Sequence, residues 1–279
     1  MKWKPYLTPV KALDSDGARA FLDEHPLGKI TILDVRQPSE YKAGHIAGAI
    51  LIPLPELVNR LKEVPQDLPL LVYCLSGARS RAACQLLAGK APCPEIINLS
   101  GGFESWEGKA ALGDKDQGLT FFTGLESPQK VLEVAYGLEQ GLREFYLSMM
   151  DQVKNVEVQK LFKTLADIEI LHQESILKEY ARITGQNTTK KTFENSLSTG
   201  AMEGGMTTRE YIDYYMPNLD DSEDIVSLAM SIEAQALDMY LRAQARVKDP
   251  QGREALMKIA KEEQNHLTYL GRLMESLTR

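Results

Sequence analysis

The stretch ADIEILHQ, residues 166–173, lies in a run whose apolar residues recur at helical spacing, yet Glu169 and His172 interrupt the apolar face. Leu165 and Ile168 flank the two polar residues on that face. Removing a carboxylate from water in such a position costs many kcal/mol unless the charge is paired or neutralised. The stretch therefore predicts a partner that neutralises the buried charge.

The same polar pattern recurs 94 residues later in the chain. In both copies a glutamate is followed by a tyrosine after 7 residues, a second glutamate after 30 and a histidine after 33. The two copies are Glu139, Tyr146, Glu169 and His172, and Glu233, Tyr240, Glu263 and His266. Three matching offsets of polar residues rarely arise by chance, so we interpret the pattern as an internal repeat.

Long amphipathic patterns carry both copies. They predict four helices, at residues 128–153, 155–184, 222–248 and 250–277, with start signals at Ser127-Pro128, Asp221-Ser222 and Asp249-Pro250. A long crossover separates the two helix pairs and contains one short helical pattern, TTREYIDYY. Four helices with a single long crossover are typical of an all-α ferritin-like bundle.

The repeated residues match a dimetal carboxylate site. Residues three apart share a helix face, so each Glu-x-x-His can aim both side chains at one point. Two divalent cations would balance four buried carboxylates, and one glutamate from each of two helices plus Glu-x-x-His from the others is the di-iron or di-manganese pattern. The predicted ligands are Glu139, Glu169, His172, Glu233, Glu263 and His266. The alternative is a set of acids that face solvent.

Two features of the metal site stay open at this point. Tyr146 and Tyr240 lie on the same faces as the ligands, and either donate hydrogen bonds to the carboxylates or simply pack. The ligand types suit iron, manganese or a mixed pair.

The first half of the chain has a different pattern. ITILDV (30–35), LLVYC (70–74) and EIINL (95–99) read as buried strands, and amphipathic stretches at 55–64 and 80–89 read as helices between them. Such alternation predicts an α/β domain with a parallel sheet flanked by helices. We expect this domain at residues 1–110, a linker at 111–126 and the helical domain at 127–279.

The stretch YCLSGARSRAACQLL, residues 73–87, follows a strand and opens a helix. Backbone N–H groups curling around the sulfur of Cys74, the helix N-terminus and the charge of Arg79 all favour thiolate, so Cys74 is the predicted nucleophile. Its Cys-x4-Arg loop is one residue shorter than the Cys-x5-Arg loop of cysteine phosphatases, which favours sulfur transfer. We expect Cys84 to be a core residue, whereas Cys93 is a candidate resolving thiol.

Composition limits the classes of function. The net charge of −7 argues against nucleic acid as a partner. No apolar run is long enough to span a membrane, and the N-terminal residues lack the apolar core of a secretion signal, so we expect a cytoplasmic protein. Three cysteines do not form a disulfide framework.

Three segments together resemble a single rhodanese domain: LDVRQPSEYKAGHIAGAILIP (33–53), the cysteine stretch and INLSGGFESW (97–106). The resemblance implies a thiosulfate- or persulfide-type sulfurtransferase in which Cys74 carries the sulfur. The residues that match the family's active loop are Ser76, Gly77, Ala78, Arg79 and Ser80. Leu75 departs from the family, because many members have a basic or polar residue there.

The helical half resembles the rubrerythrin-like branch of the ferritin-like superfamily. The resemblance implies two iron ions and peroxide- or oxygen-reducing chemistry, with Glu169 and Glu263 as bridging ligands, Glu139 and Glu233 as terminal ligands and one histidine on each iron. Rubrerythrins often carry a further glutamate where this chain has Ala236, and often a four-cysteine electron-donor module that this chain lacks.

These observations lead to one hypothesis and two alternatives. The hypothesis is a cytoplasmic, homodimeric sulfurtransferase with a small-molecule sulfur donor, a thiol or cyanide-like acceptor, and a redox-active dimetal bundle served by an unidentified electron donor. The first alternative is a persulfide carrier or sensor that does not turn over. The second is metal storage.

Overall fold

The computed structural model describes residues 10–106, 110–114, 116, 118–122, 127–185, 190, 193, 208–215 and 217–277. The chain forms two compact units, Met1–Lys115 and Asp116–Arg279. Among the described helices, none combines the length and the hydropathy that a bilayer span requires.

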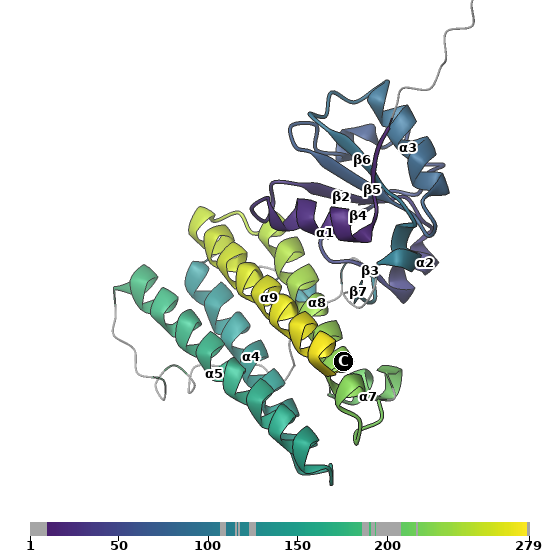
Figure 1. Cartoon of the computed structure of the whole chain (residues 1–279). Helices are drawn as coiled ribbons and strands as arrows, with labels where there is room; N and C mark the ends of the chain where they lie inside the picture. Colours follow the sequence, from purple (N-terminus) through teal and green to yellow (C-terminus); the bar gives the residue numbers. More distant parts are fainter. Residues whose placement is uncertain are drawn as a thin grey trace, which may run out of the picture. The chain divides into compact units, whose positions relative to one another are not determined.

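The first unit is an α/β domain built on a parallel sheet (Figure 1). Its elements are β1 (Lys11–Leu13), α1 (Ser15–Asp23), β2 (Thr31–Asp34), α2 (Pro38–Ala43), β3 (His45–Ile46), β4 (Ile50–Leu51), η1 (Leu61–Glu63), β5 (Leu70–Tyr73), α3 (Ala78–Ala88), β6 (Ile96–Leu99), η2 (Gly102–Ser105) and β7 (Ala110–Ala111). Five parallel strands follow the order β1-β6-β5-β2-β4, and β3 pairs with β7 in a separate antiparallel ribbon. The predicted parallel sheet is therefore confirmed.

Strand β5 is the centre of the sheet and is buried along its whole length. Its side chains alternate between two apolar clusters: Leu70 and Val72 pack in one, and Leu71 and Tyr73 pack in the other. Because β2, β5 and β6 run parallel, their carboxyl ends lie at one edge of the sheet, where ligand sites of α/β folds commonly form.

The expected helix at residues 55–64 is wrong. The structure has turns there, followed only by the short 3-10 helix η1. Val64 has extended backbone angles, φ −85° and ψ 119°, as the residue before Pro65 prefers. The amphipathic pattern arises because Leu57 and Val64 enter the core from a turn-rich segment.

The segment expected as a linker contributes to both units. Ala111 pairs with His45 through the β3–β7 ribbon, and Leu112 is buried. Farther along, the 3-10 helix η3 (Leu119–Phe122) buries Leu119 and Phe122 and packs against α4 and α8 of the second unit. Residues 107–109, 115, 117 and 123–126 lie outside the described residues.

The second unit is a helical bundle (Figure 1). Its helices are α4 (Pro128–Met150), α5 (Val156–Thr184), α7 (Thr208–Tyr215), α8 (Ser222–Arg246) and α9 (Pro250–Leu277). Helix α4 packs along α5, α8 packs along α9, and α4 also contacts α9. The four long helices and the short helix of the crossover were all predicted, and their bounds differ by only a few residues.

Capping side chains fix where the long helices begin. Ser127 accepts from the Lys130 N–H, and Asp221 accepts from the Glu223 N–H. The Asp249 carboxylate accepts from the Gly252 N–H at 2.6 Å. These three caps are the predicted start signals, and each satisfies an amide that the helix leaves unpaired.

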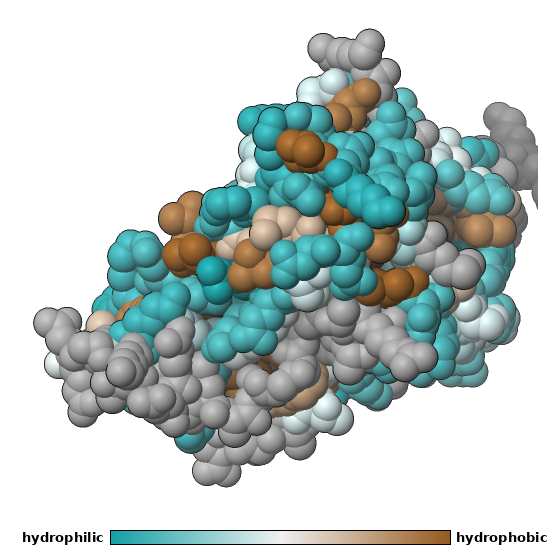
Figure 2. Space-filling model, turned by 90° about the horizontal axis from the view of Figure 1, so that it is seen from below, coloured by the Kyte–Doolittle hydropathy of each residue, from teal (hydrophilic) through white to brown (hydrophobic). Residues whose placement is uncertain are grey.

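On the face that Figure 2 displays, the coloured residues are mostly hydrophilic, and apolar side chains form separate patches among them. The large apolar side chains that are exposed, among the described residues, are Val58, Leu75, Val156, Leu171, Tyr214, Tyr269 and Leu277. Two of them, Leu75 and Leu171, adjoin predicted functional residues.

Candidate functional site

Cys74 is the first residue after the central strand β5, at the carboxyl edge of the sheet. The chain then turns through Gly77, which has φ 92° and precedes the first residue of α3. A positive φ favours glycine, which explains its place in this turn. We name residues 74–80 the cysteine loop.

Hydrogen-bond donors surround the Cys74 sulfur. The Gly77 N–H donates to Sγ at 3.2 Å and the Ser80 hydroxyl lies 3.5 Å from it. Burial opposes the thiolate, but the Ser80 hydroxyl and the amides of Ser80, Gly77 and Ser76 outweigh burial, so the pKa of Cys74 lies below its usual value. The loop therefore stabilises negative charge on sulfur.

Two backbone N–H groups of the 3-10 helix η2 donate hydrogen bonds to the cysteine loop. The Phe103 N–H donates to the Cys74 carbonyl at 2.8 Å, and the Glu104 N–H donates to the Leu75 carbonyl at 3.0 Å. Gly102 makes this approach possible, because a Cβ there would lie 2.4 Å from the Leu75 carbonyl oxygen. The stretch 97–106 thus contributes backbone contacts to the cysteine loop.

Arg79 does not offer an unopposed positive charge, contrary to expectation. Its guanidinium donates two parallel hydrogen bonds to Glu40, at 2.8 and 2.6 Å. Glu40, on α2, was not singled out from the sequence because 39 residues separate it from Arg79. The Gln37-to-Glu40 capping-box spacing marks Glu40 as a helix-start residue, but does not reveal its partner.

The other residues of the cysteine loop differ in their exposure to solvent. Leu75, Ser76 and Ala78 are exposed, whereas Gly77 and Ser80 are buried. The loop therefore presents an apolar side chain, Leu75, next to the reactive sulfur.

The remaining cysteines have separate surroundings. Cys84 belongs to the core as expected, and burial raises its pKa to about 12. Cys93 is half-buried, with Sγ 3.7 Å from the Pro65 carbonyl, and its role as a resolving thiol stays a prediction.

Three polar residues near the sheet are structural. Arg36 is buried, binds Asp34 at 2.7 Å and donates to the Gly44 carbonyl at 2.6 Å. His45 is also buried, and its ring stacks on Tyr41. These contacts fix α2 and β3 against the sheet.

The second unit brings the repeated residues together in its interior. Glu139 lies on α4, Glu169 and His172 on α5, Glu233 on α8, and Glu263 and His266 on α9. All four carboxylates are buried, and the side chain of His266 is 18% exposed. The expected alternative of acids that face solvent is excluded by this burial.

Each histidine faces the acids of its own copy. His172 Nδ1 lies 3.0 Å from Glu139 and from Glu169, and His266 Nδ1 lies 3.6 Å from Glu233 and from Glu263. Between the copies the imidazole rings stack, with Nε2 atoms 2.5 Å apart. The sequence repeat is thus also a repeat in space.

The buried glutamates and histidine of the first copy shift one another's pKa. Burial opposes an imidazolium, but Glu139 and Glu169 outweigh it and raise the pKa of His172 to about 12. Burial raises the pKa of Glu139 to about 7, although His172 lowers it in part. The two glutamates of the first copy therefore favour positive charge at the position of His172.

The cluster fits a metal centre. Glu139, Glu169 and His172 have ligand atoms within 4.8 Å of one another, as do His172, Glu263 and His266. Within the described part of the chain, buried atoms such as Glu139 Oε1 and His266 Nδ1 have no hydrogen-bond partner. Buried polar atoms rarely stay unsatisfied, and carboxylate oxygens with imidazole nitrogens suit iron or manganese.

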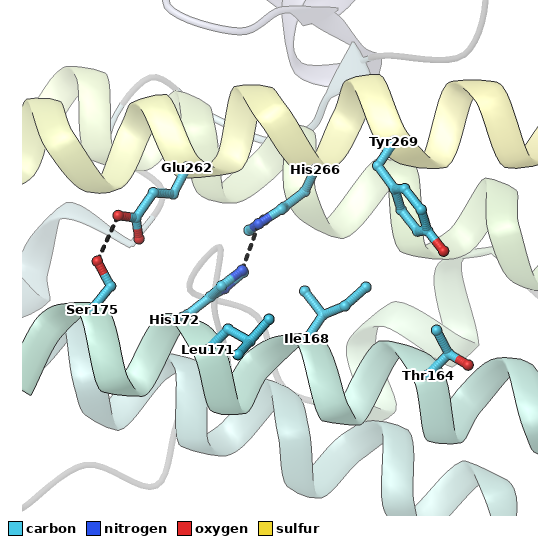
Figure 3. Close-up of a pocket in the computed structure, with 8 residues that line it drawn as sticks. All are labelled: Thr164, Ile168, Leu171, His172, Ser175, Glu262, His266 and Tyr269. Atoms are coloured by element: carbon cyan, nitrogen blue, oxygen red, sulfur yellow. Dashed lines mark hydrogen bonds between the residues drawn. The ribbon is translucent and has the colours of Figure 1, made fainter.

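A groove between α5 and α9 reaches the histidines (Figure 3). The cavity measures about 530 Å³ and is lined by Thr164, Ile168, Leu171, His172, Ser175, Glu262, His266 and Tyr269. At one end the Ser175 hydroxyl donates to Glu262 at 2.6 Å and bridges the two helices. Neither residue was identified from the sequence, because a single polar contact between helices has no periodic signal.

Tyr146 and Tyr240 are both buried. The ring of Tyr146 packs on Phe145 and Phe162, and that of Tyr240 packs edge-on against Phe122. A packing role is therefore present, whereas hydrogen bonding from these hydroxyls to the carboxylates stays a prediction.

Comparison with family models assigns both units. The model described as Rubrerythrin matches residues 130–274, and the model described as Rhodanese-like domain matches residues 18–109. The chain belongs to the rubrerythrin family. Its first unit is a rhodanese-like domain, a family associated with sulfur transfer or sulfur carriage, and the rubrerythrin domain implies a metal-binding diiron site with redox chemistry.

Similar proteins match the rhodanese-like unit. The chain is 47% identical over 81 residues to "Uncharacterized protein YqhL" of Bacillus subtilis, covering 29% of this chain and 64% of that protein. It is 35% identical over 77 residues to "Sulfurtransferase" of Allochromatium vinosum, covering 28% and 71%. "Putative sulfur carrier protein YrkF" of Bacillus subtilis is 36% identical over 80 residues, covering 29% and 43%.

Among solved structures, the Rhodanese-like Domain Protein from Staphylococcus aureus covers 35% of this chain and 91% of its own chain, with 26% identity and a TM-score of 0.32.

Proposed function

We propose that the rhodanese-like unit is a sulfurtransferase that carries sulfane sulfur on Cys74. The thiolate attacks the outer sulfur of a donor R–S–SH, the S–S bond of the donor breaks, and R–S⁻ leaves while Cys74 becomes Cys–S–SH. A thiol or cyanide acceptor then takes the outer sulfur and restores Cys74. The observation that carries the proposal is the ring of donors on Sγ, at 3.2 Å from the Gly77 N–H and 3.5 Å from the Ser80 hydroxyl.

The residues of the cysteine loop have different roles in the proposed transfer. The amides of Ser76, Gly77 and Ser80 stabilise negative charge on the attacking thiolate and on the persulfide that follows. Leu75 and Ala78 lie exposed where a donor approaches, and Arg79 lies beside them with its charge shared by Glu40. Transfer requires no external oxidant or reductant, because each sulfur–sulfur bond that breaks is replaced by a new bond to the transferred sulfur: a sulfur–sulfur bond with a thiol acceptor, or a carbon–sulfur bond with cyanide.

The test is sulfur transfer from thiosulfate and from an organic persulfide to cyanide, with thiocyanate measured as product. Cys74→Ala should abolish transfer from both donors. Cys93→Ser removes the candidate resolving thiol, and retained activity in this variant would show that transfer needs no second thiol. Full activity in Cys74→Ala would refute the sulfurtransferase proposal.

A persulfide carrier or sensor is the second candidate for this unit. The exposed apolar side chain of Leu75 favours this candidate, because an apolar surface beside Cys74 suits a charged sulfur donor poorly. One matched relative is also named a putative sulfur carrier. A carrier would accept sulfur once per Cys74 and show no repeated cycle with cyanide. Mass spectrometry of the loaded chain separates this outcome from turnover.

For the bundle, we propose that two metal ions, iron or alternatively manganese or a mixed pair, bind the six glutamate and histidine residues of the repeat. When bound, such a pair supplies redox chemistry toward peroxide or oxygen. The chain itself contributes four buried carboxylates that balance the cations and two imidazoles, while the apolar helix faces exclude bulk water. The groove between α5 and α9 leaves a path by which a small oxidant can reach His172 and His266.

Elemental analysis of protein purified without added metal tests this second proposal. The expected content is two metal ions per chain, together with peroxide consumption when an artificial electron donor is supplied. Metal below one ion per chain after reconstitution would exclude a dimetal centre. Light scattering tests the proposed homodimer and separates it from the large hollow assembly that metal storage requires.

A further inference from the structure

The ion pair between Arg79 and Glu40 determines how much positive charge the cysteine loop offers to an anion. Two parallel hydrogen bonds join the planar groups, at 2.8 and 2.6 Å, which is the strongest geometry for such a pair. The side chains are 36% and 27% exposed, so solvent screens the pair only in part. With this pairing the two groups together carry no net charge.

The Glu40 carboxylate is held in place by more than Arg79. The Gln37 N–H at the start of α2 donates to Glu40 Oε2 at 3.0 Å, and the neighbouring Tyr41 is buried in the core. The hydrogen bonds from Arg79 are the largest reason that the pKa of Glu40 falls to about 2, so the carboxylate stays ionised at neutral pH. Arg79 is therefore paired with a carboxylate whose position is also held by the Gln37 N–H.

The nearby arginines do not replace Arg79. The Arg36 guanidinium is buried against Asp34 and lies over the Phe103 ring, 4.2 Å from its centroid. Arg81 follows Arg79 by two residues on α3, and residues two apart point from different helix faces. Leu75, exposed directly after Cys74, adds apolar surface at the same place.

We infer that Glu40 is a specificity-determining residue: by holding Arg79 it makes the loop favour organic persulfides, which carry low charge and apolar groups, over dianionic thiosulfate. The inference rests on the proposed sulfur transfer. Glu40 acts through Arg79 and is a positioning residue, since no contact between Glu40 and the sulfur is needed.

The test uses two alkylating reagents of nearly equal size, iodoacetate and iodoacetamide, on the reduced full-length chain. Burial slows both reagents alike, so the ratio of their rates at Cys74 reports local charge. Mass spectrometry of the Cys74 peptide separates this reaction from those of Cys84 and Cys93. Glu40→Gln should raise the iodoacetate-to-iodoacetamide ratio by about threefold to tenfold, and Arg79→Gln should lower it.

Two controls match these variants. Glu63→Gln removes a carboxylate that also binds an arginine, Arg60, through two hydrogen bonds at 2.7 Å, but outside the loop, and should leave the ratio unchanged. Glu40→Asp keeps the charge and should stay near the wild-type ratio. In turnover, Glu40→Gln should lower the KM for thiosulfate severalfold while the KM for an organic persulfide changes little.

An unchanged ratio in Glu40→Gln with native circular dichroism would overturn the inference, as would a raised ratio in Glu40→Asp. If Glu40→Gln does not fold, an unchanged ratio in Arg79→Gln overturns it instead. Because alkylation needs no sulfur donor, these outcomes are distinct from loss of the proposed function, which Cys74→Ala tests.

Discussion

At the scale of the residue, the two sites handle negative charge in different ways. The cysteine loop surrounds a single thiolate with neutral donors, namely the amides and the hydroxyl around Sγ, and the Arg79 guanidinium, paired with Glu40, also interacts with it. The bundle holds four carboxylates, whose charge exceeds what its two histidines can balance. Neutral donors can stabilise one small charge, whereas a buried cluster of acids needs cations.

The lowered pKa of Cys74 predicts its reactivity against pH. Thiolate forms as pH rises through the pKa, so alkylation of Cys74 should reach half its maximum rate at a lower pH than for an ordinary thiol. Ser80→Ala removes a donor and should move the midpoint to higher pH. Free glutathione in the same buffer serves as the ordinary thiol for comparison. A midpoint for Cys74 at or above that of glutathione would contradict the prediction.

Metal content should distinguish two buried glutamates on one helix. Glu169→Gln should lose about half of the bound metal or more, because it removes a charged ligand. Glu179→Gln is the matched control: Glu179 is also buried on α5, but it binds Lys258 and Arg182 at 3.2 and 2.5 Å. Elemental analysis of both variants makes the comparison, and equal metal loss in the two would count against a site at Glu169.

At the scale of the element, the loop depends on the close approach of η2. Gly102 has φ 62°, and an added Cβ would lie 2.4 and 2.5 Å from the carbonyl oxygens of Leu75 and Cys74. The cysteine loop is therefore positioned by a neighbouring turn as well as by its own sequence.

Gly102→Ala should destabilise its unit by about 2–4 kcal/mol, combining the positive φ with the clash. It should also slow sulfur transfer, because the displaced carbonyls move Cys74. Gly185→Ala is the control for φ alone: Gly185 has φ 66° with nothing within 4 Å of an added Cβ, so about 1 kcal/mol is expected. Urea unfolding of both variants measures the difference, and similar losses would mean that the clash relaxes.

The helices of the second unit were predicted well because their signals are local, whereas α1 and α2 of the first unit were not identified. Apolar periodicity and the caps at Ser127, Asp221 and Asp249 lie within a few residues of the boundaries they set. The prediction for 55–64 failed because apolar residues at helical spacing also occur in a turn-rich segment that touches the core. Two-residue strands such as β4 carry too little sequence to be recognised.

The candidate sites could also be predicted only where their residues lie close together along the chain or belong to the repeat. Spacing within one helix brought Glu169 and His172 together, and the repeat related them to the second copy. The pairing of Arg79 with Glu40 and the stacking of His172 on His266 depend on how distant segments pack. No local pattern encodes such contacts, so the sequence alone overestimated the free charge of Arg79.

At the scale of the whole molecule, the chain divides into two compact units, and we propose a different chemistry for each of them. Nothing in the proposed sulfur transfer requires the metal, and nothing in metal binding requires Cys74. The units should therefore respond independently to their ligands.

Metal should stabilise the bundle alone. A ligand present at 100 times its Kd adds about 2.7 kcal/mol to the folded state, which raises Tm by roughly 5–10 °C in a unit of this size. Differential scanning calorimetry of the full chain should show one transition that rises with Fe²⁺ or Mn²⁺ and one that does not. Cys74→Ala should respond as the wild type does. Equal shifts of both transitions would show that the units unfold together.

The duplicated motif bears on the ancestry of the bundle. One helical hairpin supplies a glutamate and one Glu-x-x-His, which is half of the six residues. A lone hairpin could complete such a centre only by associating with an identical twin, as in a symmetric pair of short polypeptides. With both copies in one chain, a substitution in one copy is not repeated in the other, so each half of the centre can change on its own.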